Sequence, residues 1–203
     1  MPRDSRNGVP AACLAAGLVL LLASVGCRAR SDASPLPIIA SVPDFSLIDQ
    51  SGGPIRRADL LGKVWIADFI FTRCAGPCPR MSQVMAELQG RLSSIPGVRL
   101  VSFSVDPERD TPAILTEYAS RYRADHNRWV FITGGREEIY DLAIDGFKLQ
   151  VESETDTTPI LHSTHLLLVD RAGQIRGAFD GEDPATLPKL EAAVRRLAAE
   201  RGP

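Results

Sequence analysis

The sequence predicts a single α/β domain in which a central mixed sheet is flanked by helices and preceded by an N-terminal hairpin. Apolar runs rich in strand-favouring residues alternate along the chain with segments whose apolar residues recur at helical spacing. The 203 residues, 44% of them hydrophobic and 24% charged, suffice for one globular domain with a short appendage. The net charge of -2 and the lack of a dense basic run argue against nucleic acid as a partner.

The appendage has the pattern of an export signal. Arg3 and Arg6 precede an apolar run over residues 11–25, which is shorter than the roughly 20 residues of a membrane-spanning helix. The following Gly26-Cys27 resembles a bacterial lipoprotein cleavage box. We expect residues 1–26 to be removed and Cys27 to be acylated, which would leave the protein exported and membrane-anchored, facing the periplasm or the cell exterior. An ordinary cleaved signal or a signal anchor would export the domain equally.

The next segment, residues 27–43, is rich in Ser, Ala and Pro and is interpreted as a tether to a domain over residues 44–203. The domain opens with a strand near 45–49 and a Gly52-Gly53 turn, which predict a hairpin. The apolar run over residues 64–71 predicts a central strand covered on both faces. After it, Pro79 begins a segment of helical apolar spacing that extends to Leu92.

The alternation continues to the C-terminus. We expect strands at residues 98–105, 129–133, 165–169 and 174–179 and helices at 112–122, at 137–147 and after Asp183-Pro184. Thr111 is the expected cap of the first of these helices. A polar stretch over residues 148–158 predicts a long loop that leads to His162.

Two cysteines remain once Cys13 is removed with the signal and Cys27 is acylated. Cys74 and Cys78 lie four residues apart where a strand meets a helix, so both sulfurs fall on one side of the helix start. In an oxidising compartment such a pair forms either a disulfide or a metal site. The helix N-terminus is expected to lower the pKa of the thiols.

His162 and His165 are the histidines nearest the predicted final strands. Because they lie an odd number of residues apart in an extended stretch, they face opposite sides and do not readily join one site. This argues against a two-Cys, two-His zinc centre and leaves two thiolates and one imidazole. Such a set suits Cu(I), and a weak fourth ligand would admit Cu(II). His126 and His165 are interpreted as ordinary histidines.

With these residues in place, the chain resembles the Sco/SenC family of copper-binding assembly factors for cytochrome c oxidase. The resemblance extends from about Val42 to the last helix. Three motifs carry it: Phe71-Thr-x-Cys74-x-x-x-Cys78-Pro79, Ser104-Val-Asp106-Pro-Glu-Arg-Asp110-Thr-Pro112, and His162-Ser163 eleven residues before Gly173. It implies a thioredoxin-like fold and a copper site made of Cys74, Cys78 and His162. We interpret Asp110 as a helix cap and Asp106 as a contact to the metal loop or to a partner.

Two functions follow as alternatives. The first is a metallochaperone, not an enzyme, that receives copper with the help of a thiol reductant and delivers it to the CuA site of cytochrome c oxidase or to another copper enzyme. The second is a thiol-disulfide oxidoreductase in which Cys74 attacks a client disulfide and His162 is dispensable.

Overall fold

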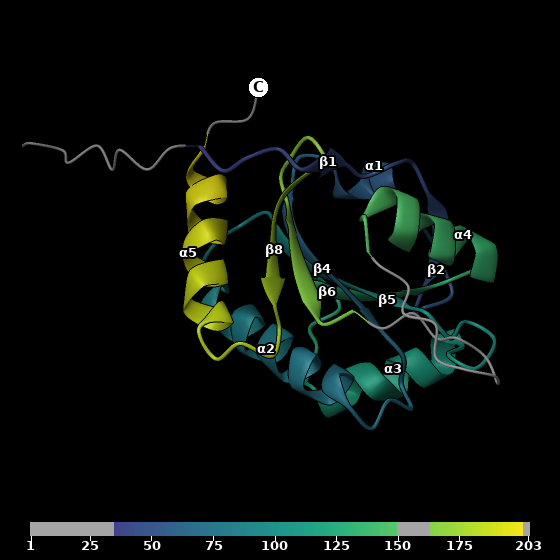
Figure 1. Ribbon diagram of the computed structural model, residues 1–203. Coiled ribbons are helices and arrows are strands. Elements are labelled where there is room, and N and C mark those ends of the chain that lie inside the picture. Colours follow the sequence, from purple (N-terminus) through teal and green to yellow (C-terminus); the bar gives the residue numbers. More distant parts are fainter. Residues whose placement is uncertain (1–34, 150–162, 201–203) are drawn as a thin grey trace, which may run out of the picture. The chain divides into compact units, whose positions relative to one another are not determined.

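An eight-stranded mixed sheet runs through the part of the chain that the computed structural model describes, residues 35–149 and 163–200 (Figure 1). In spatial order the strands are β1 (Ala40–Ser41), β8 (Gln174–Asp180), β7 (His165–Val169), β4 (Val64–Ile70), β5 (Val98–Ser104), β6 (Trp129–Thr133), β2 (Ser46–Asp49) and β3 (Pro54–Arg56). The pairs β4–β5 and β5–β6 are parallel and the other pairs are antiparallel. The antiparallel pair β2–β3 confirms the predicted N-terminal hairpin.

Strand β4 is the centre of the sheet, and all seven of its residues are buried. Helices cover both of its faces, as the continuous apolar run predicted. Side chains alternate along the strand, so Trp65 and Phe69 share one face while Asp68 lies on the other. The strand thus brings one acidic residue into the core directly before the cysteine segment.

Six helical segments of the described residues surround the sheet. They are α1 (Arg57–Leu60), α2 (Pro77–Arg91), α3 (Pro112–Arg121), α4 (Arg136–Asp141), the π-helical turn η1 (Leu142–Gly146) and α5 (Thr186–Ala199). Figure 1 shows α2 and α3 along one face of the sheet and α1 and α4 on the opposite side. Thr111 caps α3 as predicted, since its side chain accepts a hydrogen bond from the Ile114 amide at 3.5 Å.

The predicted helix at 137–147 is divided, because α4 continues into the wider turn η1. The Phe147 amide donates to the Leu142 carbonyl five residues earlier, at 2.9 Å. This ending places the Phe147 ring in an edge contact with Phe69 at 5.2 Å between centroids, and Phe69 in turn stacks on Phe103 at 5.0 Å. The aromatic contacts fix the core on the Phe69 face of β4.

The N-terminal part of the domain begins earlier than the sequence indicated. Ala40 and Ser41 form β1 and pair with β8, within the segment expected to be a tether. The Arg176 guanidinium also donates to the Leu36 carbonyl at 2.7 Å. A strand of two residues is too short to show a period in sequence, so this packing was not predicted. The predicted signal, Cys27 and the first part of the tether lie outside the described residues, and no helix of the described residues is long and apolar enough to cross a membrane.

Candidate metal centre

Cys74 and Cys78 lie at the junction of β4 and α2, as predicted. β4 ends at Ile70 and α2 begins at Pro77, so Cys74 lies in the connecting loop and Cys78 is the second residue of the helix. Both are free thiols. Cys74 is half-buried, whereas Cys78 is 4% exposed. The two sulfurs therefore differ in their access to solvent.

A tight turn holds the two thiols next to each other. The Cys74 amide donates to the Phe71 carbonyl at 3.2 Å, which closes the turn after β4. The Cys74 thiol and the Phe71 backbone both lie close enough to the Cys78 thiol to shift its pKa. Two soft sulfur donors are thus already adjacent, as a two-thiolate metal site or a disulfide requires.

The Cys78 thiol does not have the lowered pKa that its place at a helix N-terminus suggested. Burial is the largest cause and raises its pKa, and Cys74 and the charge of Asp68 raise it further. The hydrogen bond from the Phe71 backbone acts in the opposite direction and is outweighed. The expectation of a lowered pKa is therefore wrong for Cys78, because burial overrides the helix terminus.

The third predicted ligand, His162, lies outside the described residues. Among the residues that the structure does describe, no three His, Cys, Asp or Glu side chains gather closely enough to hold a metal ion. The copper site with His162 as its third ligand therefore stays a prediction. The donor chemistry of Cys74 and Cys78 fits a soft metal, since they are free, neighbouring thiols.

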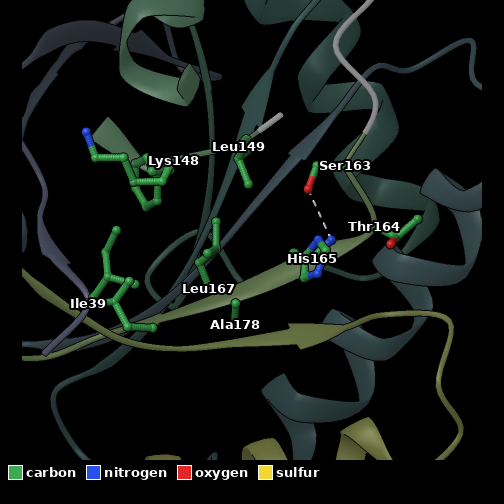
Figure 2. A pocket seen from close by; sticks show the side chains of 10 residues that line it. Ile39, Lys148, Leu149, Ser163, Thr164, His165, Leu167 and Ala178 are labelled. Atoms are coloured by element: carbon green, nitrogen blue, oxygen red, sulfur yellow. Dashed lines mark hydrogen bonds between the residues drawn. The ribbon is translucent and has the colours of Figure 1, made fainter. Parts of the chain in front are cut away.

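The other two histidines have ordinary surroundings. His165 is exposed at the start of β7, and its backbone amide donates to the Ser163 hydroxyl at 3.2 Å. Figure 2 shows it on the wall of a cavity of about 530 Å³ that Leu167 and Ala178 also line. His126 forms a hydrogen bond with the Gln50 side chain at 3.0 Å.

Asp110 does not cap α3, contrary to the interpretation from the sequence. Its carboxylate is 1% exposed and points to the cysteine loop, where it accepts hydrogen bonds from the Thr72 amide at 3.0 Å and the Thr72 hydroxyl at 2.6 Å. The Ser104 hydroxyl donates a third bond at 2.6 Å. A buried carboxylate with three donors is well compensated, so Asp110 holds the loop that precedes Cys74.

Asp106 contacts the same loop, which is one of the two contacts that the sequence analysis expected for it. Its carboxylate accepts a hydrogen bond from Nε of Arg73 at 2.9 Å. The side chain of Arg73 is 48% exposed and that of Asp106 is 12% exposed. Sequence reasoning missed Arg73, although its place directly before Cys74 was a usable signal.

Asp68 is a second residue that the sequence analysis overlooked. It is fully buried in β4, and neither of its carboxylate oxygens has a hydrogen-bond partner among the described residues. Burial raises its pKa to about 7, and the neighbouring Ser102 hydroxyl lowers it by a smaller amount. A charged residue inside the otherwise apolar run of residues 64–71 was the signal that could have identified it.

Comparison with known proteins places these features in a family. The SCO1/SenC family model matches residues 37–199. A relative from Bacillus subtilis, described as a SCO1 protein homolog, is 35% identical over 171 residues, which cover 83% of this chain and 86% of the relative.

Two solved structures extend the comparison. BsSco, described as a member of the Sco family of cytochrome c oxidase assembly proteins with a disulfide switch, matches with a TM-score of 0.71 and 33% identity over 82% of this chain and 97% of its own. Copper-bound ScoI from Bradyrhizobium japonicum matches with a TM-score of 0.60 and 26% identity, over 78% and 99% of the two chains.

Proposed function

This chain belongs to the SCO1/SenC family, and on that premise we propose that it binds copper through Cys74, Cys78 and His162 and delivers it to a copper enzyme. Its fold is the thioredoxin-like α/β fold that the resemblance implied. One observation carries the proposal: two free thiols are neighbours at the β4–α2 junction, close enough for Cys74 to shift the pKa of Cys78. Copper bound to the Bradyrhizobium relative supports the choice of metal.

The sulfur pair favours Cu(I), because thiolates are soft ligands. Loading removes both thiol protons, and the proton of buried Cys78 is the harder to remove since burial raises its pKa. The imidazole of His162 would be the third donor, and a weak fourth ligand would admit Cu(II). An oxidising compartment converts the free pair to a disulfide, so loading needs a thiol reductant or prior protection by the metal.

Transfer begins at the more accessible sulfur in this proposal. Cys74 is half-buried and Cys78 is 4% exposed, so an incoming ligand of the acceptor reaches the metal from the Cys74 side. Cys78 then releases the metal last. The acceptor we propose is the CuA site of cytochrome c oxidase, in keeping with the description of BsSco as an oxidase assembly protein.

The proposed site of action rests on the pattern of the N-terminal residues. We propose that the signal is cleaved before Cys27 and that acyl chains on Cys27 hold the domain at the outer face of a bacterial membrane. This position exposes the domain to enzymes whose copper sites face the same compartment. Mass spectrometry of the mature N-terminus tests it, since an unmodified Cys27 would contradict the lipid anchor.

The function is tested by anaerobic titration of the reduced protein with Cu(I) against a competing chelator. We expect one tight equivalent that weakens strongly in His162→Ala and is lost in Cys74→Ser. His126→Ala is the matched control and should bind as tightly as the native chain. Weak binding by the native chain, or tight binding that is indifferent to His162, would favour the thiol-disulfide oxidoreductase instead.

A further inference from the structure

The two residues between Phe71 and Cys74 are held from a neighbouring loop by separate carboxylates. Thr72 is held by Asp110, and Arg73 is held by Asp106. We propose that Arg73 and Asp106 are positioning residues whose ion pair fixes the turn that carries Cys74 in the geometry needed for metal binding. The inference rests on the proposed function, because it concerns the same pair of thiols.

The contacts form a closed ring of five residues, linked through both side chains and backbone. Asp110 accepts from Thr72 and from the Ser104 hydroxyl, and the Asp106 amide donates to that same Ser104 hydroxyl at 3.1 Å. The Asp106 carboxylate accepts a hydrogen bond from Nε of Arg73 at 2.9 Å. Arg73 belongs to the cysteine loop, so this bond closes the ring. Further backbone bonds order the second loop, since the Asp110 amide donates to the Asp106 carbonyl at 2.9 Å. Both carboxylates are therefore presented from a rigid support.

Movement of this turn would displace both sulfurs. The Phe71 carbonyl accepts a hydrogen bond from the Cys74 amide at 3.2 Å, and the loop then leads directly into α2, whose second residue is Cys78. Thr72 and Arg73 are the two residues enclosed by the turn from Phe71 to Cys74. Releasing Arg73 from Asp106 frees one side of the turn while Asp110 still holds the other, so the sulfurs lose their fixed separation without loss of the fold.

The two halves of the ring differ in what they contribute to stability. Asp110 is 1% exposed and satisfies buried donors, so its removal disturbs the core. The Arg73 side chain is 48% exposed, and ion pairs of this exposure contribute little to the stability of a fold. An effect of Arg73 on metal binding without an effect on Tm therefore separates positioning from a general structural role.

The test is a double-mutant cycle on the full chain, with the native protein, Arg73→Gln, Asp106→Asn and the double variant. Each single variant should bind Cu(I) about 10-fold more weakly, in line with losses seen when groups that orient metal ligands are removed. The double variant should be no worse than either single one. The matched control is the exposed pair Arg121–Glu117, 2.6 Å apart, whose removal by Arg121→Gln should change nothing.

If Arg73 instead acted through its charge on the Cys74 thiolate, the two single variants would differ from each other. Asp106→Asn leaves that charge uncompensated, so the two single variants would then change the rate of Cys74 alkylation by iodoacetamide in opposite directions. Positioning moves the rate in the same direction in both. Opposite directions, additive effects in the double variant, or native affinity in both single variants would overturn the proposal. The alkylation assay needs no copper, so it decides this inference even if the native chain fails to bind Cu(I).

Discussion

Burial raises the pKa of the Cys78 thiol most, and the buried carboxyl group of Asp68 adds a smaller electrostatic contribution in the same direction. The two groups come from adjoining elements, β4 and α2, and both are shielded from water. Neither oxygen of Asp68 has a hydrogen-bond partner within the described chain. A carboxyl group in such surroundings is stable when neutral and costly when charged.

The first prediction concerns the pH dependence of stability. Asp68 has a pKa of about 7 in the folded protein against 3.8 as its ordinary value. Its neutral form is favoured by folding, so its contribution is fully present below pH 3.8 and is lost as the pH rises through 7. The shift corresponds to about 4 kcal/mol. Urea unfolding of the native chain and Asp68→Asn, measured from pH 4 to pH 8, should show the variant gaining relative stability as the pH rises.

The difference between the two curves isolates Asp68, because every other titrating group is common to both proteins. Asp49→Asn is a suitable control, since Asp49 is a partly exposed carboxylate of a turn that accepts a hydrogen bond from the Ser51 amide. Parallel curves for the native chain and Asp68→Asn would show that Asp68 is ionised to the same extent in the folded and unfolded states.

The second prediction concerns the unequal access of the two thiols. Cys74 is half-buried, whereas Cys78 is 4% exposed and burial raises its pKa. Because the thiolate is the reactive form, iodoacetamide should label Cys74 at least about 10-fold faster than Cys78 in the reduced protein. Mass spectrometry of peptides from a time course measures both rates. Equal labelling would remove the basis for transfer that begins at Cys74, and Cys74→Ser provides the isolated rate of Cys78.

The third prediction concerns Asp110. Asp110→Ala leaves the Thr72 amide, the Thr72 hydroxyl and the Ser104 hydroxyl without their acceptor in a buried place. Such a loss costs about 3 kcal/mol of the free energy of unfolding, which urea denaturation measures. Thr111→Ala, which removes the cap of α3, should cost about 1 kcal/mol. If Asp110→Ala cost no more than Thr111→Ala, the carboxylate would not be holding the loop.

The sequence predicted those parts of the fold that have a long, regular pattern. The apolar run of residues 64–71 identified β4, and the helical spacing after Pro79 located α2 and therefore the cysteine junction. β1 and the π-helical turn η1 were missed, because two or five residues show no period. Their places depend on tertiary pairing with β8 and on the packing of Phe147.

The position of the two cysteines was predictable from the sequence, whereas the residues that hold their loop were not. Spacing alone brought Cys74 and Cys78 together, since both belong to one local segment. The partners of the loop come from residues 104–110, more than thirty positions away, and their contacts depend on the parallel pairing of β4 with β5. The motif that contains Asp106 and Asp110 indicated that this segment contributes to the site. The turn residues around Asp110 suggested that it caps a helix, whereas in the fold it accepts hydrogen bonds from Thr72 of the cysteine loop.

The fourth prediction concerns metal removal and oxidation. A metal that binds the folded state alone raises stability by about 4 kcal/mol when its free concentration is 1,000 times the dissociation constant. Cu(I) should therefore raise the Tm of the reduced chain, protect Cys74 from alkylation, and lose both effects when a strong chelator removes it. A chain oxidised to the Cys74–Cys78 disulfide has no thiolate to offer, so Cu(I) should leave its Tm unchanged until a reductant is added. Equal stabilisation of the oxidised chain, or of Cys74→Ser with Cys78→Ser, would place the metal on other residues and separate copper binding from the thiol pair.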